Sequence, residues 1–164
     1  MPLLETHGLK LYYSTTAGAI KAVDNVSFTL EKGEALGVVG ESGCGKTSLA
    51  LAIMRLLPRN VDTYEGSLTF EETDLMKFSE DEYRRKVRWK KISMGFQGAM
   101  NSLNPVIRVG HQVAEPLLVN GSTDKHEAYH QAKILLETVG LPRDVFNRYP
   151  HELSGGMKQR IVIA

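Results

Sequence analysis

The chain has 164 residues, of which 42% are hydrophobic and 24% are charged, and its formal net charge is +1. This length and composition suit a globular protein that needs no disulfide or metal to stabilise its core. The near-neutral charge argues against a broad nucleic-acid-binding surface, and the single cysteine excludes an internal disulfide. The sequence shows no leader pattern, and no apolar run approaches the roughly 20 residues that span a bilayer. We therefore expect a cytosolic protein whose membrane role, if it has one, depends on a partner.

The first part of the sequence predicts strands followed by an α/β arrangement. Apolar and polar residues alternate over 26–30, which is typical of a strand with one buried face. A turn at 31–34 precedes a continuous apolar run at 35–39, which predicts a strand buried on both faces. A glycine-rich loop then leads into a helix expected from about Lys46 to Leu57, where Pro58 would end it.

Three further elements are predicted before residue 97. Residues 66–70 have the alternation of a strand. Ser79, with Glu82 three residues later, forms the pattern of a capping box for a basic helix that extends to about Lys90. Residues 92–96 are expected to form a strand that ends at Gln97.

The remainder of the sequence is predicted to be helical. The two main helices are expected at 109–119 and 125–139, and Gly140 is placed to terminate the second in a left-handed conformation. A last helical segment is expected at 158–164. The predicted order is therefore β, then α/β, then α.

Residues 40–47, GESGCGKT, match the phosphate-binding pattern G-x-x-x-x-G-K-[ST] between a predicted strand and a helix. Glycines let backbone N–H groups converge on phosphate oxygens, and the helix N-terminus adds unpaired donors. Lys46 would reach the β- and γ-phosphates, and the Thr47 hydroxyl would bind Mg²⁺. A chance glycine-rich turn is the weaker interpretation, because every fixed position matches. The predicted nucleotide-binding residues are Gly40, Glu41, Ser42, Gly43, Cys44, Gly45, Lys46, Thr47 and Ser48.

A second candidate anion site lies near the end of the sequence, at residues 153–160, LSGGMKQR. Ser154 and the two following glycines would expose N–H groups at the start of a helix. This segment resembles the signature of ABC-transporter ATPases. The sequences FQ at 96–97, NSLNP at 101–105 and YPHE at 149–152 resemble the ATPase subunits of dipeptide and oligopeptide importers, and the resemblance covers nearly the whole chain.

The resemblance implies an incomplete ABC-type P-loop NTPase fold of the α/β class. It would comprise an antiparallel β portion, part of the P-loop core sheet and a helical signature subdomain. Residues 1–97 would form the ATP-binding core, and 98–154 a helical subdomain with a groove for the permease. Residues 155–164 would begin the signature helix that returns to the core.

The resemblance also assigns roles to single residues. Lys46 and Gln97 would be catalytic, with Gln97 contacting Mg²⁺ and responding to the permease. Tyr13 would stack on adenine, and the neighbouring Tyr12 is the alternative. Ser154, Gly155 and Gly156 would bind the γ-phosphate of ATP that is held by the P-loop of a second ATPase subunit. The implied cofactors are ATP and Mg²⁺.

The implied function is ATP-driven import of di- and oligopeptides by paired ATPase subunits on transmembrane permease subunits, at the cytoplasmic face of the membrane. The alternatives are an ABC ATPase for another substrate such as nickel, a non-transport ABC ATPase and a non-catalytic interaction fragment. The sequence departs from the family where Gly98 and Ala99 replace an acidic residue and proline. It also stops before the family's Walker B aspartate, catalytic glutamate and switch histidine. We therefore expect residues 1–164 to bind nucleotide but to hydrolyse it poorly.

Overall fold

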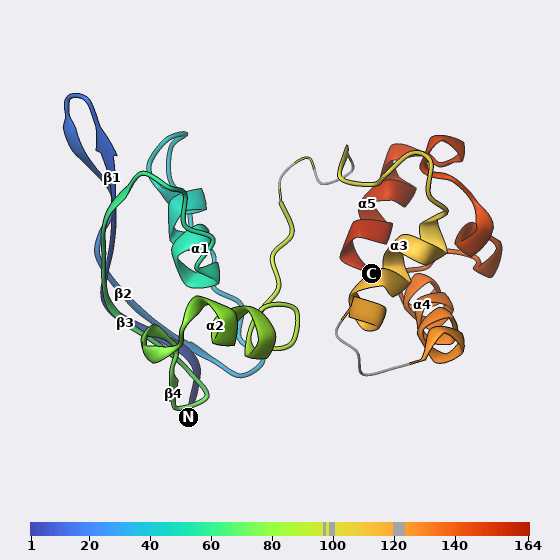
Figure 1. Cartoon of the computed structure of the whole chain (residues 1–164), viewed down its shortest axis with the longest axis horizontal. Coiled ribbons are helices and arrows are strands. Elements are labelled where there is room, and N and C mark those ends of the chain that lie inside the picture. The colour runs from blue at the N-terminus through green and yellow to red at the C-terminus, as the bar shows by residue number, and fades with distance from the viewer. Residues whose placement is uncertain (97, 99–100, 120–123) are drawn as a thin grey trace. The chain divides into compact units, whose positions relative to one another are not determined.

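The computed structural model describes residues 1–96, 98, 101–119 and 124–164. These residues form two compact units, Met1–Met94 and Gly95–Ala164, shown in Figure 1. The first unit is a curved sheet with two α-helices, and the described residues of the second unit form helices and no strand.

The first unit is built on one antiparallel sheet with the strand order β2-β1-β3-β4. The long strand β1 lies between β2 and β3 and pairs with both along most of its length. The strands predicted at 26–30 and 66–70 are confirmed, and both are parts of longer strands. The four strands are β1 (Pro2–Thr15), β2 (Gly18–Glu31), β3 (Val61–Phe70) and β4 (Thr73–Asp74).

A bulge at Gly8 determines which side chains of β1 are buried. Thr6 pairs with Phe28 and Leu9 pairs with Val26, so β1 has one residue more than β2 between these two pairs. One extra residue reverses the side-chain alternation, which lets Leu4 and Thr6 share a buried face with Leu9 and Leu11. Gly8 has a φ of 57°, which glycine adopts without strain.

The helices α1 (Lys46–Met54) and α2 (Glu80–Lys86) cover this buried face in Figure 1. Leu9, Leu11 and Val23 pack against Ala52 of α1. Further along the sheet a second apolar cluster joins the strands to α2, and it consists of Leu4, Leu68, Leu75, Tyr83 and Val87. The sheet is therefore the platform on which both helices are positioned.

Helix α1 ends at Met54, so the predicted end at Leu57 is wrong. Arg55 takes a left-handed conformation with φ 50°, and its N–H donates to the carbonyl of Ala52 over 3.1 Å. The N–H of Leu56 then donates to Leu51 over 3.0 Å, which completes a Schellman-type ending. The helix therefore ends through backbone geometry before Pro58 is reached.

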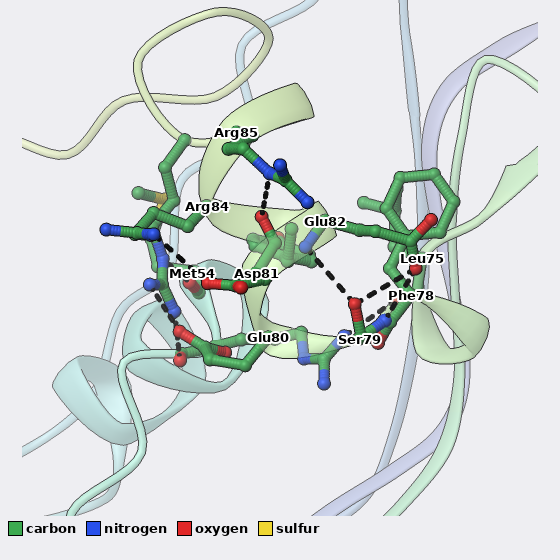
Figure 2. A network of polar contacts seen from close by, with 12 residues as sticks. Met54, Leu75, Phe78, Ser79, Glu80, Asp81, Glu82, Arg84 and Arg85 are labelled. Carbon is green, nitrogen blue, oxygen red and sulfur yellow. Dashed lines mark hydrogen bonds and ion pairs between the residues drawn. The ribbon is translucent and has the colours of Figure 1, made fainter. Parts of the chain in front are cut away.

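Helix α2 begins with the predicted capping box, which is confirmed. The Ser79 hydroxyl accepts from the N–H of Glu82 over 3.3 Å, and the Glu82 carboxylate accepts from the N–H of Ser79 over 3.0 Å (Figure 2). The helix ends at Lys86 rather than near Lys90. The chain turns tightly there, because the carbonyl of Val87 accepts from three successive backbone N–H groups, those of Lys90, Lys91 and Ile92.

Two predicted strands are not formed. Residues 35–39 have no strand partner in the described part of the chain, and Val38 and Val39 are 50% and 96% exposed instead of buried. Residues 92–96 make a single bridge, between Ile92 and Arg88, and no strand. An apolar run signals a tendency to be buried, but a strand also needs a neighbour that accepts its hydrogen bonds.

Where the structure describes the second unit, α-helices and 3-10 turns surround one apolar core. The helices predicted at 109–119 and 125–139 are confirmed. Gly110 allows α3 to pack closely against Phe146, because a Cβ at this glycine would lie 2.2 Å from the ring. The elements are α3 (Val109–Val119), α4 (Lys125–Thr138), α5 (Gly155–Ile163) and the turns Arg143–Asn147 and Pro150–Glu152.

Gly140 terminates α4 as the sequence predicts. Its φ is 73°, its N–H donates to Glu137 over 2.9 Å, and the N–H of Leu141 donates to Leu136 over 2.9 Å. This pair of hydrogen bonds is the Schellman motif. Arg160 of α5 donates to the carbonyl of Gly140 over 3.0 Å, so the end of α4 is joined to the last helix.

None of the helices in the described ranges is long and apolar enough to cross a bilayer.

The burial of two tyrosines predicts how stability changes at alkaline pH. Desolvation raises the pKa values of Tyr64 and Tyr83 to about 12 each, from about 10 for an exposed tyrosine. The folded state therefore retains protons that the unfolded state releases, so the contribution of these two tyrosines to the free energy of unfolding is fully present below about pH 10 and is lost as the pH rises from about 10 to about 12. Urea unfolding measured by circular dichroism should show this decline. The Tyr83→Phe variant should decline less steeply, and an equal slope in both proteins would contradict the assignment.

Candidate nucleotide-binding site

The predicted phosphate-binding loop lies at the N-terminal end of α1 and is exposed. Gly43 and Gly45 have φ values of 84° and 95°, in the left-handed region that glycine alone adopts freely. The N–H of Cys44 donates to the carbonyl of Glu41 over 3.3 Å, which closes a tight turn inside the loop. The glycines therefore serve the backbone geometry that the sequence predicts for them.

Lys46, the first residue of α1, extends back over the loop. Its Nζ donates to the carbonyl oxygens of Gly40 over 2.7 Å and Glu41 over 2.6 Å, and it lies 3.4 Å from the Sγ of Cys44. These carbonyls carry only partial charges. An anion in the loop would therefore find the ammonium already positioned and would form a stronger, charge-assisted contact with it.

The amide end of α1 has no side-chain cap, because its N-cap residue is Gly45. The first-turn N–H groups of a helix have no partner within the helix, and the helix dipole places positive potential there. No acidic side chain occupies this first turn. Thr47 lies in the same turn with an exposed side chain, and Ser48 follows it half-buried. The arrangement is that of an anion-binding helix terminus.

Close packing against β2 fixes the position of the loop. A Cβ at Gly45 would lie 2.1 Å from the carbonyl oxygen of Ala22. The pairing of β1 with β2 passes from Leu11–Val23 to Tyr12–Lys21, so Ala22 lies at an irregularity in β2. The phosphate-binding loop is therefore fixed against a backbone irregularity of the sheet.

A cavity of about 370 Å³ opens beside the loop. Its lining includes Lys46, Asp24 and Val39, so it lies between β2, the loop and the unpaired segment 35–39. Small-molecule sites have volumes of roughly 300–1,000 Å³. The cavity falls within this range.

The two candidate tyrosines of β1 lie in different surroundings. Tyr13 is half-buried against the cluster that joins β1 to α1, with Leu49 and Val61 packed against the same cluster. Tyr12 donates from its hydroxyl to Asp24 over 2.5 Å, and this hydrogen bond lowers the pKa of that carboxyl. Tyr13 is therefore placed on the side of the sheet that carries α1, while Tyr12 is engaged in a polar cluster with Asp24.

The second candidate anion site forms the start of α5 in the second unit. Ser154 is the N-cap, and its hydroxyl accepts from the N–H of Met157 over 3.4 Å. Gly155 and Gly156 are exposed, and nothing lies within 4 Å of a Cβ built at Gly156. Leu153 is buried in the core of the unit and anchors the segment. The signature segment therefore presents exposed backbone at a helix N-terminus.

Gln97 lies outside the described residues. Among the other predicted site residues, Gly40 to Ser48 gather at the start of α1, Tyr13 lies in the same unit, and Ser154 to Gly156 lie in the second unit.

Sequence reasoning missed the side chains that hold the other end of α1. Tyr64, Tyr83 and Arg88 donate to its last carbonyls from positions that are far away in the sequence. The hint that the sequence offered was the basic character of the helix expected after Ser79.

Comparisons with known proteins assign the class. A family model described as ABC transporter matches residues 23–164. The solved ATP-binding cassette MJ0796, a dimer in a post-hydrolysis state bound to ADP and Pi, matches with a TM-score of 0.77 and 25% identity. That match covers 98% of this chain and 67% of the cassette. The chain belongs to the ABC transporter family, and its α/β fold is that of an ABC ATPase cassette in part.

The similar curated proteins are more specific. The chain is 46% identical to the dipeptide transport ATP-binding protein DppD of Lactococcus lactis, over 99% of this chain and 47% of that protein. It is 43% identical to the oligopeptide transport ATP-binding protein AppD of Bacillus subtilis, over 99% of this chain and 50% of that protein. The chain thus spans about half the length of the curated relatives it matches. The predicted resemblance to peptide-importer ATPases is confirmed.

The contact between Gly45 and Ala22 makes a testable prediction. Gly45→Ala should destabilise the protein through backbone strain and through the clash with the Ala22 carbonyl. Gly43→Ala is the matched control, because it has a similar φ but nothing within 4 Å of its Cβ. Strain should cost both variants about 1–2 kcal/mol, and the clash should cost Gly45→Ala about 1–3 kcal/mol more. Urea unfolding measures the difference, and equal losses in the two variants would show that the contact is absent.

Proposed function

We propose that this chain provides the ATP-binding site of an ATPase subunit that powers peptide import. The observation that carries the proposal is the amide end of α1, where Lys46 is held over a glycine loop and no side chain caps the helix. A site of this kind fits the triphosphate of a nucleotide. The names of the similar curated proteins support peptides as the transported substrate.

The residues of the loop fit ATP and Mg²⁺. The loop amides and the Lys46 ammonium would hold the β- and γ-phosphates, and Thr47 has an exposed hydroxyl in the first turn of α1 that suits an oxygen-binding cation. When bound, Mg²⁺ neutralises the phosphate charge that develops during phosphoryl transfer. Gln97 would complete the metal site. Tyr13 would stack on the adenine, and Tyr12 is less suited because its hydroxyl already binds Asp24.

The signature segment would complete the site in a dimer. Gly155 and Gly156 expose backbone at the start of α5, which suits a second contact with a γ-phosphate. We propose that these residues serve the nucleotide bound by a second ATPase subunit. The solved cassette that resembles this chain is described as dimeric, which supports the arrangement.

The remaining parts of the proposal concern the membrane. The subunit would bind transmembrane permease subunits at the cytoplasmic face, through the helical part of the chain at 98–154. Nickel import is the second candidate substrate class, and a binding role without catalysis is the other alternative. The names of the curated relatives favour peptides over nickel.

Nucleotide binding tests the proposal directly. Lys46→Ala should weaken the binding of ATP with Mg²⁺ by about 10- to 100-fold, because a charge-assisted hydrogen bond contributes about 1.5–3 kcal/mol. Equilibrium dialysis with labelled ATP provides the dissociation constants. Lys32→Ala removes an exposed lysine from the turn after β2 and is the control, which should leave the affinity unchanged. Equal affinities of Lys46→Ala and the wild-type protein would contradict the proposal.

Cellular uptake separates the substrate classes. Cells whose gene carries Lys46→Ala should lose uptake of a labelled dipeptide and keep uptake of Ni²⁺. Loss of Ni²⁺ uptake alone would favour the nickel alternative, and no change in either would favour the role without catalysis.

A further inference from the structure

The carbonyl end of α1 is held by side chains from other parts of the first unit. The hydroxyl of Tyr64 on β3 donates to the carbonyl of Ala52 over 2.9 Å, and the buried Tyr83 of α2 donates to Ile53. Arg88 donates from Nε to the carbonyl of Met54 over 2.9 Å and from Nη2 to that of Arg55. The last carbonyls of a helix lack partners within the helix, so the contacts to Ile53, Met54 and Arg55 satisfy such groups, while the carbonyl of Ala52 also accepts from the N–H of Arg55.

Arg88 donates to two carbonyls at this end of α1, whereas Tyr64 and Tyr83 donate to one each. Its side chain is only 13% exposed, and Nη1 donates to Glu80 over 2.6 Å, so all three guanidinium nitrogens are engaged. Figure 2 shows Glu80 and Met54 on the same side of α2, where these contacts converge. The guanidinium also lies 5.4 Å from the centre of the Tyr83 ring. A cation at this end of a helix is further favoured by the helix dipole.

The backbone of Arg88 begins the segment through which the first unit ends. Arg88 forms a bridge with Ile92, and Ile92 packs against the apolar cluster under α2. The chain then leaves the unit after Met94 and continues toward Gln97. One residue thus contacts the helix that follows the phosphate-binding loop and also starts the segment that leads out of the unit.

Helix α1 links the phosphate-binding loop at its amide end to Arg88 at its carbonyl end. Its nine residues form a rod of about 13 Å. The amide end has no side-chain cap, whereas the carbonyl end carries the contacts of Tyr64, Tyr83 and Arg88. A displacement of the rod caused by a ligand at the amide end would therefore act on these contacts.

We propose that Arg88 is a positioning residue that couples occupancy of the phosphate-binding loop to the segment 88–94. The proposal rests on the proposed function, because it needs a nucleotide in the loop. Arg88 itself lies at the far end of α1 and touches no phosphate. A merely structural role would make Arg88 important for stability but would leave the segment 88–94 unaffected by nucleotide.

The protein contains its own reporter for this coupling. Trp89 is the single tryptophan, is 68% exposed, and directly follows Arg88. Its N–H donates to the carbonyl of Ile92 over 3.0 Å, so it belongs to the turn at the start of the segment. Its φ of 64° is unusual for a bulky residue, so this turn is sensitive to a change in its contacts.

Tryptophan emission, excited at 295 nm, is recorded while ATP with Mg²⁺ is titrated into the whole chain, and labelled ATP measures binding in parallel. In the wild-type protein the Trp89 emission should change with the same midpoint as binding. Arg88→Lys keeps the charge but loses the planar fork that reaches two carbonyls and Glu80. This variant should bind ATP about 3- to 10-fold more weakly and should lose most of the emission change at saturation.

Tyr64→Phe is the matched control. It removes one hydrogen bond to the same end of α1, from a strand that is not part of the segment 88–94. It should keep the emission change, and its unfolding midpoint shows how much stability such a contact contributes. Loss of the emission change in Tyr64→Phe as in Arg88→Lys would overturn the specific role of Arg88.

If Arg88→Lys does not fold, the wild-type protein still tests whether nucleotide in the loop affects the segment 88–94. Binding of ATP with no change in Trp89 emission would overturn the coupling and leave the proposed function intact. Absence of ATP binding would overturn both. A saturable emission change that follows ATP occupancy supports the coupling.

Discussion

The first unit depends on α1, a helix whose two ends differ in how their backbone groups are hydrogen-bonded. The carbonyl end of α1 is closed by hydroxyl and guanidinium donors, while its amide end follows Gly45 and has no side-chain cap. Unpaired helix amides attract anions, and the side chains bound to the carbonyl end would respond if an anion displaced the helix. The anion site at the amide end and the side-chain contacts at the carbonyl end therefore both act on the position of α1.

The sheet determines where α1 and the phosphate-binding loop lie. The bulge at Gly8 brings two alternating sets of β1 side chains to a single face, and α1 packs on that face through Ala52. The irregularity of β2 at Ala22 allows its carbonyl to approach Gly45 so closely that only glycine fits. The position of the loop is thus determined by backbone contacts, which tolerate change in most surrounding side chains but not in these glycines.

The local features of the fold could be predicted from the sequence. The Ser79–Glu82 capping box, the Gly140 helix ending and the helices α3 and α4 depend on residues close together in the chain, and all of them are found. The phosphate-binding loop was located in the same way, because its glycine spacing is a local requirement of the backbone.

The predictions that were wrong or missing concern features that depend on residues far apart in the sequence. The apolar run at 35–39 signals burial but does not supply the neighbouring strand that a sheet requires. The early end of α1 depends on the left-handed Arg55, whose guanidinium donates to the distant carbonyls of Leu75 and Phe78. The role of Arg88 was hidden for the same reason, since its acceptors on Met54 and Arg55 precede it by 34 and 33 residues. A cluster of charged residues in a sequence does not show which of its side chains is buried in the folded protein.

We propose that the unpaired amides at the start of α1 form the phosphate site. Residue-resolved NMR of the amide groups during titration with ADP and Mg²⁺ tests it most directly. The amides of residues 43–48 should show the largest shifts and saturate together, with smaller shifts along α1. Saturable binding that leaves the amides of 43–48 unchanged while others shift would contradict it.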